Sequence, residues 1–319
     1  MRVRLPGSSV TTSALGLGCA GLSAGWSRDS SVRLVHVAYD AGIRHFDVAP
    51  PYGMGSAEGV LGQGLEKRRH NVTIATKVGL ARPQHAETVM LVRNLAAPVR
   101  RLAPQIARRI GASTYQGMRK RPKLTAAFIE NSLAESLRLL RTDYVDLLLL
   151  HEATPEDLTE DVLKALERLR TQGIARCLGT GTSYENTLSI RADHPHFFNA
   201  WQHSWSVLDA DSREPSEFTI TYGSIQQALA KVRTWLNGEP GRLRCMSETT
   251  GVDIAGEEEL GCTLLGAAVA HNPTGITLVS SRQKKRVQAN ARLLVDPTFV
   301  RAGQQLMSAV TAGMEMAHL

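Results

Sequence analysis

The sequence predicts a (β/α)₈ barrel formed by a single domain of 319 residues. Strand-like and helix-like segments alternate along the chain. Several of the strand-like segments are continuous apolar runs, which are typical of parallel strands buried on both faces. Polar side chains stand where successive strands end, as they do on the functional rim of such barrels. Barrels of this class commonly occupy this length as one domain, so we expect residues 1–319 to form one unit, with a doubly wound sheet as the alternative.

The expected elements follow in order from local patterns. Apolar runs give eight candidate strands: Ala14–Ala20, Ile43–Val48, Val72–Lys77, Tyr144–His151, Ala175–Gly179, Phe197–Gln202, Phe218–Tyr222 and Gly275–Ser280. Helical spacing gives the segments between them: Ser30–Ala41, Ala57–Lys67, Thr125–Leu140, Thr159–Gln172 and Ile225–Leu236. Gly42 and Gly173 directly follow two of these helices, at the position where glycine commonly ends a helix.

Two stretches interrupt the alternation. Residues 79–123 separate the third strand from its helix by far more than an ordinary βα connection, and residues 89–110 within them have partly helical spacing. Residues 237–259 are rich in Gly, Glu and Thr without a clear period, so we expect a surface loop there. The glycines at 16–21 lie within and after the first strand and open no expected helix, which argues against a doubly wound dinucleotide-binding fold.

Composition limits the class of protein. Hydrophobic residues form 43% of the chain and charged residues 21%, which is ordinary for a soluble globular protein with a sizeable core. No apolar stretch is long enough to span a membrane, and the run at 14–20 is too short and glycine-broken for a secretion signal. The cysteines are scattered, without a CxxC pair or histidines at metal-binding spacing. We therefore expect reduced thiols, a cytoplasmic location and no metal site.

The net charge of +7 is concentrated in one segment. Between Glu87 and Glu130 there is no acidic residue, and the same stretch contains nine basic ones: Arg93, Arg100, Arg101, Arg108, Arg109, Arg119, Lys120, Arg121 and Lys123. The rest of the chain sums to 7 − 9 = −2. Because the basic character belongs to the insertion at 79–123, it argues against a nucleic-acid-binding fold. As the loop after the third strand, this insertion is expected over the mouth of the site, as a lid, a partner-binding arm or a solvated loop.

Four polar residues of different chemistry stand at or just beyond the ends of three successive strands. They are Asp47, Tyr52, Lys77 and His151. A carboxylate, a phenol, an amine and an imidazole on one barrel rim predict an acid/base site. Each residue alone has a structural interpretation as a capping or solvated side chain, but the four together favour catalysis. His45, two positions before Asp47, is assigned to the opposite strand face as a structural residue.

These residues stand in motifs that resemble the aldo-keto reductase superfamily. Residues 42–53 read GIRHFDVAPPYG and are followed by AEGVLG at 57–62. Residues 74–77 read IATK, 136–151 read SLRLLRTDYVDLLLLH and 173–179 read GIARCLG. The resemblance runs from about residue 5 to about residue 290. The DVAP and GxGxAE patterns are similar to those of bacterial members that act on sugars and small aldehydes.

The resemblance assigns roles that the chemistry of the residues supports. Reducing a carbonyl requires a proton donor, and a free tyrosine with a pKa of about 10 is too weak an acid to work in both directions near neutrality. An ammonium at Lys77 lowers the pKa of the phenol, Asp47 is its counter-ion, and His151 donates to the substrate oxygen. The resemblance implies these roles, with Tyr52 as acid/base. The expected partner is a small-molecule carbonyl substrate.

The resemblance also implies a nicotinamide cofactor, NADPH or NADP most often and NAD as the alternative, since no side chain supplies a hydride. Gln202 matches a carboxamide-binding position and Tyr222 a ring that stacks on nicotinamide. The matching adenosine-side residues are Ser280, Ser281, Arg282, Arg286 and Asn290. Thr182 replaces a family asparagine that grips the carboxamide, and Ala289 replaces a glutamate. Trp26, after the first strand, is assigned to an apolar substrate cleft or to simple packing.

Three functional hypotheses remain at this point. The first is an oxidoreductase that interconverts an aldehyde, ketone or sugar carbonyl with its alcohol. The second is a nucleotide-sensing regulatory subunit with the same fold and little turnover. The third is a nucleic-acid or acidic-partner binder that uses the basic insertion. Oligomeric state is open between a monomer and a weak homo-oligomer.

Overall fold

The computed structural model describes residues 1–22, 27–83, 121–209 and 217–315. In these residues, eight parallel strands close into a barrel in the order β10-β3-β4-β5-β6-β7-β8-β9, which confirms the predicted fold class. The barrel strands are β3 (Leu15–Gly18), β4 (His45–Asp47), β5 (Thr73–Val78), β6 (Val145–His151), β7 (Ala175–Gly181), β8 (Ala200–Ser204), β9 (Thr219–Tyr222) and β10 (Ile276–Val279). Each segment predicted as a strand overlaps one of them.

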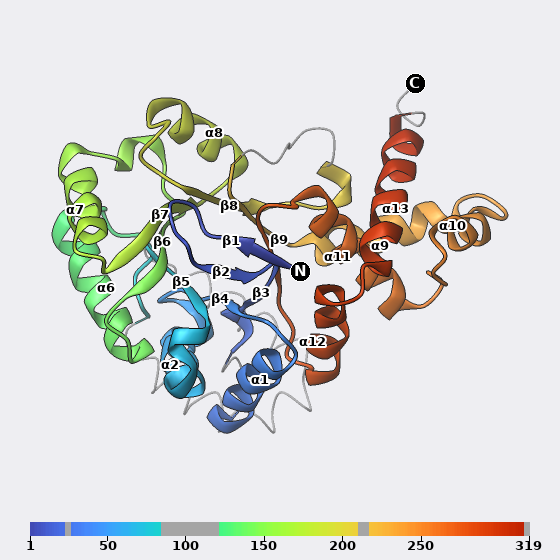
Figure 1. The fold of residues 1–319 in the computed structure, drawn as a ribbon. Helices are drawn as coiled ribbons and strands as arrows, with labels where there is room; N and C mark the ends of the chain where they lie inside the picture. The colour runs from blue at the N-terminus through green and yellow to red at the C-terminus, as the bar shows by residue number, and fades with distance from the viewer. Residues whose placement is uncertain (23–26, 84–120, 210–216, 316–319) are drawn as a thin grey trace, which may run out of the picture.

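Helices surround the barrel, as Figure 1 shows. They include α1 (Arg28–Asp40), α2 (Ala57–Leu65), α6 (Ala126–Leu140), α7 (Glu160–Thr171), α8 (Tyr184–Asp193), α9 (Ser224–Asn237), α11 (Glu257–His271) and α12 (Lys284–Ala291). The predicted ends are confirmed where the chain has clear signals. The Thr125 side chain caps α6 by accepting from the Phe128 amide, and Gly42 and Gly173 follow α1 and α7 with φ of 96° and 71°.

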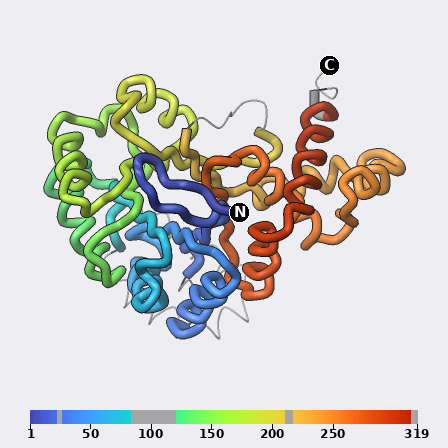
Figure 2. Tube along the Cα trace, viewed as in Figure 1, coloured from blue at the N-terminus to red at the C-terminus, as the bar shows by residue number. Residues whose placement is uncertain are grey.

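An antiparallel hairpin covers the amino-terminal end of the barrel. Its strands are β1 (Arg2–Arg4) and β2 (Thr11–Ser13), and Figure 2 shows this first, blue segment lying across the barrel. Val3 and Leu5 pack with barrel-interior residues such as Leu147 and Leu149. The hairpin therefore closes this end, and the opposite, carboxyl end of the strands carries the polar residues.

Strand alternation decides which residues face the barrel interior. Residues two apart on a strand point to the same face, and Ala75, Leu147, Leu149 and Ile220 form one interior cluster. Two residues further toward the carboxyl end of each strand, the next inward-facing position lies at the rim of the barrel. The rim positions of this interior face include Asp47, Lys77, His151, Gln202 and Tyr222.

A second apolar core lies beside the barrel. It joins α9, α10 (Arg242–Thr250), α11 and α13 (Thr298–Glu315), and Figure 1 shows α10 and α13 lying outside the ring of barrel helices. The prediction of a surface loop at residues 237–259 is therefore wrong in part, because α10 lies within this range. The helix α10 is too short to give a clear period, and left-handed Gly241 and Gly251 flank it.

Helices α11 and α13 pack closely because two glycines meet between them. A Cβ added at Gly266 would overlap the Phe299 carbonyl, and one added at Gly303 would overlap the Ala267 amide.

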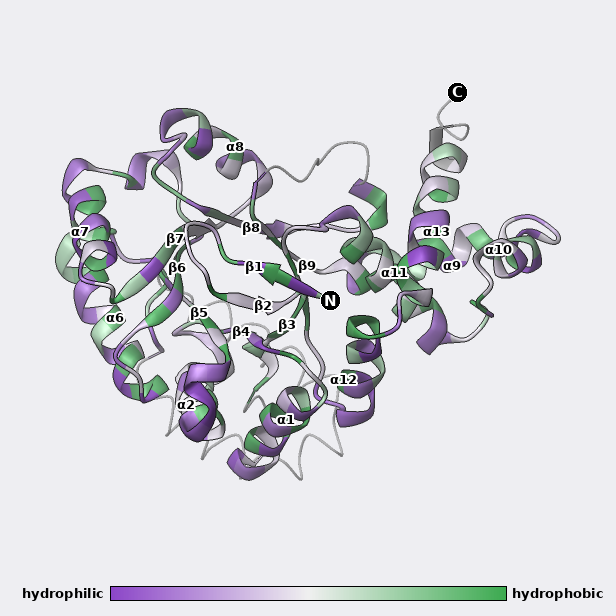
Figure 3. Ribbon diagram, viewed as in Figure 1, coloured by the Kyte–Doolittle hydropathy of each residue, from purple (hydrophilic) through white to green (hydrophobic). Residues whose placement is uncertain are grey.

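Figure 3 shows hydrophilic colours gathered on outer helix surfaces such as that of α2. Among the described residues, the longest apolar helices still fall short of what a membrane span requires.

Candidate active site

The four predicted acid/base residues come together at the carboxyl rim of the barrel. Asp47 ends β4, Lys77 stands next to last in β5 and His151 ends β6. Tyr52 begins the short 3₁₀ turn Tyr52–Gly55 that follows β4. Asp47, Lys77 and His151 are 2%, 1% and 8% exposed, so this is a desolvated site.

Lys77 and Asp47 form a buried ion pair. The Lys77 Nζ donates to Asp47 Oδ1 over 2.5 Å and lies 3.5 Å from the Val48 carbonyl. Burial by itself lowers the pKa of Lys77, but the Asp47 carboxylate and the Tyr52 phenol raise it, and the net direction is upward. The amine is therefore held as an ammonium inside the barrel rim.

The Tyr52 ring lies near both this ammonium and His151. The Lys77 Nζ lies 5.2 Å from the ring centroid, and the His151 ring meets it edge-on with centroids 5.9 Å apart. Burial raises the pKa of Tyr52, Lys77 opposes that rise, and the net direction is upward. Lys77 lowers the pKa of the phenol as predicted, but burial has the larger effect, so the expectation that the pKa falls below its ordinary value is wrong. Tyr52 is therefore a phenol at neutral pH and can donate its proton.

The turn that carries Tyr52 has an unusual backbone. Gly53, Met54 and Gly55 have φ of 58°, 60° and 88°, so three successive residues are left-handed. A left-handed conformation is costly for methionine, which bears a Cβ. A Cβ at Gly53 would overlap the Leu22 carbonyl, so the loop after β3 rests directly on this turn. Contacts outside the turn must therefore maintain its shape.

Gly79 brings the chain after β5 close to His151. Its φ is 134°, and an added Cβ would overlap the His151 carbonyl oxygen. Only glycine fits this close approach. The chain therefore leaves β5 beside His151 and continues to Arg82.

Gln202 and Thr182, both assigned to the carboxamide, also lie at the rim. The Gln202 Nε2 donates to Asp47 Oδ2 over 2.7 Å, so its amide nitrogen is engaged by the acid/base group. Thr182 donates its hydroxyl to the Ala153 carbonyl over 2.8 Å and accepts from Asn186 over 3.3 Å. The proton of Thr182 is therefore already used within the protein.

The other residues assigned to the cofactor lie on β9, β10 and α12. Tyr222 ends β9 and is 42% exposed. Ser280, Ser281 and Arg282 follow β10, and Arg286 and Asn290 lie on α12. This side of the rim adjoins β3, because β10 pairs with β3.

Arg286 has an acidic neighbour that the sequence did not indicate. Its Nη2 lies 3.3 Å from Glu257 Oε1, in the first turn of α11, and both side chains are more than half exposed. Asn290 lies at the buried edge of the same region, where its Oδ1 stands 3.9 Å from the Cys262 thiol. A residue that could hold a 2′-phosphate is thus already paired.

Two assignments lie outside the described residues. Trp26, assigned to the substrate cleft, is one, and most of the basic insertion at 79–123 is the other. The described ends of the insertion are at the carboxyl rim. Gly79 follows β5, and Arg121 pairs with Asp157 in the 3₁₀ turn Pro155–Asp157 after β6.

The assignment of His45 to the opposite strand face is wrong. Residues 45 and 47 are two apart on β4 and share the interior face. His45 is fully buried beneath Asp47, and its Nδ1 lies 2.9 Å from the Thr73 hydroxyl. Burial lowers the pKa of His45 to about 4.

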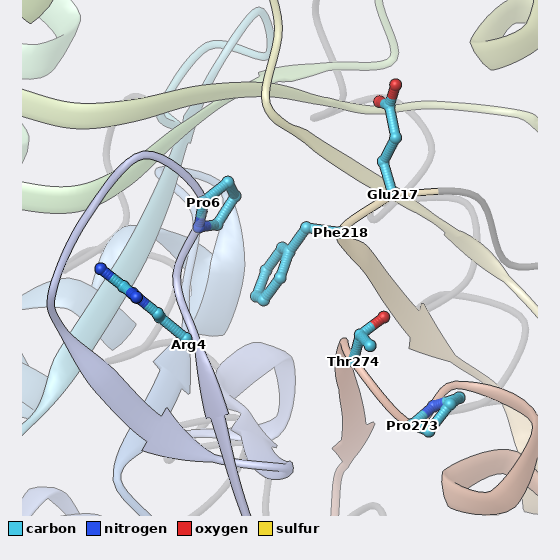
Figure 4. Close-up of a pocket in the computed structure, with 6 residues that line it drawn as sticks. All are labelled: Arg4, Pro6, Glu217, Phe218, Pro273 and Thr274. Carbon is cyan, nitrogen blue, oxygen red and sulfur yellow. The ribbon is translucent and has the colours of Figure 1, made fainter.

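A cavity lies away from this site. It has a volume of about 390 Å³ and is lined by Arg4, Pro6, Glu217, Phe218, Pro273 and Thr274, as Figure 4 shows. These residues belong to the hairpin side, at the amino-terminal end of the strands. None of the predicted site residues contributes to it. Within the described ranges, no group of three His, Cys, Asp or Glu side chains could hold a metal ion.

Known proteins resemble this chain in sequence and in fold. A sequence model described as the Aldo/keto reductase family matches residues 14–222, more than half of the chain. A D-threo-aldose 1-dehydrogenase from a Pseudomonas species is 33% identical over 184 residues, which cover 55% of this chain and 52% of that protein. This chain spans about half the length of the curated relatives it matches.

Solved structures share the fold over nearly the whole chain. An aldo-keto reductase from Bacillus halodurans in its holo form superposes with a TM-score of 0.68 at 19% identity, covering 96% of this chain and 95% of that one. An aldo-keto reductase from Klebsiella pneumoniae in complex with NADPH superposes with a TM-score of 0.62 at 19% identity, covering 92% and 90%. At this identity the likeness shows the fold alone.

Proposed function

This chain belongs to the aldo/keto reductase family, and on that basis we propose that it is an NADP(H)-dependent oxidoreductase that interconverts a carbonyl compound with its alcohol. One observation carries the proposal. The buried Lys77–Asp47 pair lies against the Tyr52 ring, and the His151 ring also contacts that ring. A proton donor, a cation that stabilises its conjugate base and an imidazole are what carbonyl reduction needs from a protein.

Each side chain has a separate task in this mechanism. In reduction, Tyr52 gives its proton to the carbonyl oxygen, and Lys77 stabilises the phenolate that remains. Asp47 keeps Lys77 charged in a site that excludes water. His151 donates to the same oxygen and orients the carbonyl. Oxidation requires the phenolate of Tyr52 as the base for the alcohol proton, and Lys77 stabilises that form against the burial that raises the pKa.

The residues on the β9–β10 side suit a nicotinamide dinucleotide. When bound, the cofactor supplies the hydride for reduction or accepts it in oxidation. Tyr222 exposes an aromatic ring at the rim, one of few large apolar side chains exposed in the described residues. The Gln202 amide oxygen can accept from a carboxamide, because its nitrogen is turned to Asp47. Thr182, with its own proton engaged, would contribute as an acceptor or by packing.

The phosphate-bearing end of the cofactor would lie on the β10–α12 side. Ser280, Ser281 and Arg282 follow the strand, and Arg286 and Asn290 lie on the helix after it. Guanidinium groups bind phosphates through charge-assisted hydrogen bonds. These side chains favour NADP(H), and the Klebsiella pneumoniae structure with NADPH supports that choice.

The proposed substrates are sugars and small aldehydes. The DVAP and GxGxAE motifs and the similarity to a D-threo-aldose 1-dehydrogenase support this class. The basic insertion at 79–123 is proposed to lie over the mouth, because its described ends meet the rim at Gly79 and at Arg121. Trp26, in the loop after β3, is proposed as an apolar substrate contact.

Fluorescence titration with NADPH and NADH, followed by turnover with a panel of aldoses and aldehydes, tests the proposal. We expect saturable NADPH binding and turnover that disappears in Tyr52→Phe. NADPH binding without turnover on any substrate would favour the regulatory-subunit hypothesis instead. Failure to bind either dinucleotide would contradict both.

A further inference from the structure

We propose that Arg82 and Glu58 are positioning residues that hold the Tyr52 phenol against Lys77. This inference rests on the proposed function, since it concerns the same proton donor. Neither residue belongs to the four acid/base residues. They link the strand that carries Lys77 to the turn that carries Tyr52.

The Arg82 guanidinium spans the Tyr52 turn. Its Nη1 donates to the Gly55 carbonyl over 2.8 Å and lies 3.4 Å from the Pro50 carbonyl. These carbonyls stand on either side of Tyr52 in the chain. Arg82 therefore ties together the two ends of the turn whose middle residues are left-handed.

Glu58 connects Arg82 to the barrel. It is fully buried in the first turn of α2, and its Oε2 accepts from Arg82 Nη2. Its Oε1 accepts from the Thr76 hydroxyl over 2.6 Å. Thr76 is the residue before Lys77 on β5. One continuous set of contacts therefore runs from the strand position beside Lys77 to the backbone around Tyr52.

This linkage suits positioning better than general stability. The turn is short, left-handed at Met54 and in contact with Leu22. The Tyr52 amide donates to Ala49 and the Ser56 amide to Gly53, and these local hydrogen bonds do not reach β5, which carries Lys77. Arginine is suited to the task because its planar fork can donate to two carbonyls and a carboxylate at once, whereas a lysine is a single point charge. A shift of about 1 Å in a reacting group is enough to cost on the order of a hundredfold in rate.

The test is Arg82→Ala in the full-length enzyme, assayed with NADPH and the best substrate of the panel. We expect kcat to fall by about tenfold or more, with the Kd for NADPH within about twofold of wild type, since Arg82 is placed away from the cofactor side. The primary deuterium isotope effect on kcat should rise, because the chemical step becomes slower. Free guanidinium at a concentration well below denaturing should restore part of kcat.

Two further variants control the result. Arg244→Ala removes an exposed arginine that pairs with Glu248 on α10, outside the ring of barrel helices, and should leave kcat and the isotope effect unchanged. If Arg82→Ala does not fold, the double variant Arg82→Met with Glu58→Gln removes both charges, so no unpaired carboxylate stays buried. It should show the same loss of kcat.

A wild-type kcat in folded Arg82→Ala, or in the double variant, would overturn the inference. The inference would also fail if kcat fell only in proportion to the loss of folded protein. In that case the isotope effect would be unchanged and guanidinium would restore no activity. The proposed function is tested separately by Tyr52→Phe. An inactive Tyr52→Phe beside a fully active Arg82→Ala removes only the positioning role, whereas an active Tyr52→Phe removes the proposed mechanism itself.

Discussion

Gln202 donates its side-chain amide to Asp47, the carboxylate that pairs with Lys77. The Gln202 Nε2 lies 2.7 Å from Asp47 Oδ2, and the Lys77 Nζ lies 2.5 Å from Oδ1. Because a carboxylate only accepts, the amide nitrogen must face Asp47, and the amide oxygen is directed elsewhere. Gln202 therefore supports the acid/base group in addition to any contact it makes with a cofactor.

The first prediction is that Gln202→Leu lowers the stability of the protein without any cofactor present. The substitution leaves one oxygen of a buried carboxylate without its donor, which costs about 1–3 kcal/mol in the free energy of unfolding. Urea unfolding of the apo protein measures this loss. Asp47→Asn in a double-mutant cycle should show coupling of about 1 kcal/mol or more with Gln202→Leu. If the effects of the two substitutions are additive, or if Gln202→Leu does not change the stability of the apo protein, Gln202 has a role in cofactor binding only.

The second prediction concerns the proton donor. Tyr52→Phe keeps the ring and removes only the hydroxyl, so the Kd for NADPH should stay within about twofold, whereas kcat should fall on the order of a hundredfold or more. Steady-state kinetics and cofactor titration on the same preparation separate the two effects. Tyr39→Phe, in the last turn of α1 and so at the opposite end of the barrel, is a control that also removes a tyrosine hydroxyl. Wild-type turnover in Tyr52→Phe would contradict the mechanism.

The third prediction is that Arg286 and Glu257 change cofactor preference in opposite directions. Arg286→Ala should weaken NADPH binding by about tenfold and NADH binding little, since one charge-assisted hydrogen bond is worth about 1.5 kcal/mol or more. Glu257 competes with a 2′-phosphate for the same guanidinium, so Glu257→Gln should tighten NADPH binding and leave NADH binding unchanged.

Titration of both cofactors at two salt concentrations checks this pair of variants. Electrostatic effects at an exposed site shrink as salt rises, so the gain in Glu257→Gln should be smaller at high salt. Glu239→Gln, on the surface after α9 and paired with Arg242, is the matched control. Equal changes for NADPH and NADH would show that neither residue faces the 2′-phosphate.

The barrel and the meeting of the four polar residues at its rim could be predicted because both follow from local patterns. Several strands are short apolar runs, and parallel strands place their carboxyl ends on one rim, so polar residues at these ends are brought to one site. Helix α11 gave no such signal. It is buried on nearly all sides from Leu260 to Val269, so its apolar residues lack the stripe that marks a surface helix.

The contacts that support the site could not be predicted from the sequence. Gln202 and Asp47 are 155 positions apart, and the Arg82–Glu58 pair depends on how a turn, a helix and a loop meet. No local pattern fixes such side-chain contacts. His45 is a different case, because the sequence does contain the needed information. It lies two residues from Asp47 on one strand, and this spacing alone places both side chains on the same face.

That buried histidine leads to the fourth prediction, on acid stability. The Asp47 and Asp146 carboxylates raise the pKa of His45 and Lys77 lowers it, but burial dominates and brings it from 6.5 to about 4. The folded protein therefore keeps His45 neutral where the unfolded chain already binds a proton. Stability should fall as pH drops from about 6.5 to about 4 and level off below, by about 3 kcal/mol in total from this group.

Urea unfolding of wild type and His45→Asn between pH 7.5 and pH 4, followed by circular dichroism, measures this contribution. Asparagine can keep the hydrogen bond to Thr73, whose hydroxyl also contacts Thr12 over 2.8 Å, but it does not titrate. The variant should be less stable at pH 7.5, because it leaves a cavity, yet lose about 3 kcal/mol less on acidification than wild type. His70→Asn, at an exposed histidine, should follow the wild-type curve. Parallel pH curves for wild type and His45→Asn would show that His45 takes up its proton equally easily in the folded and unfolded states, and that burial does not control its charge.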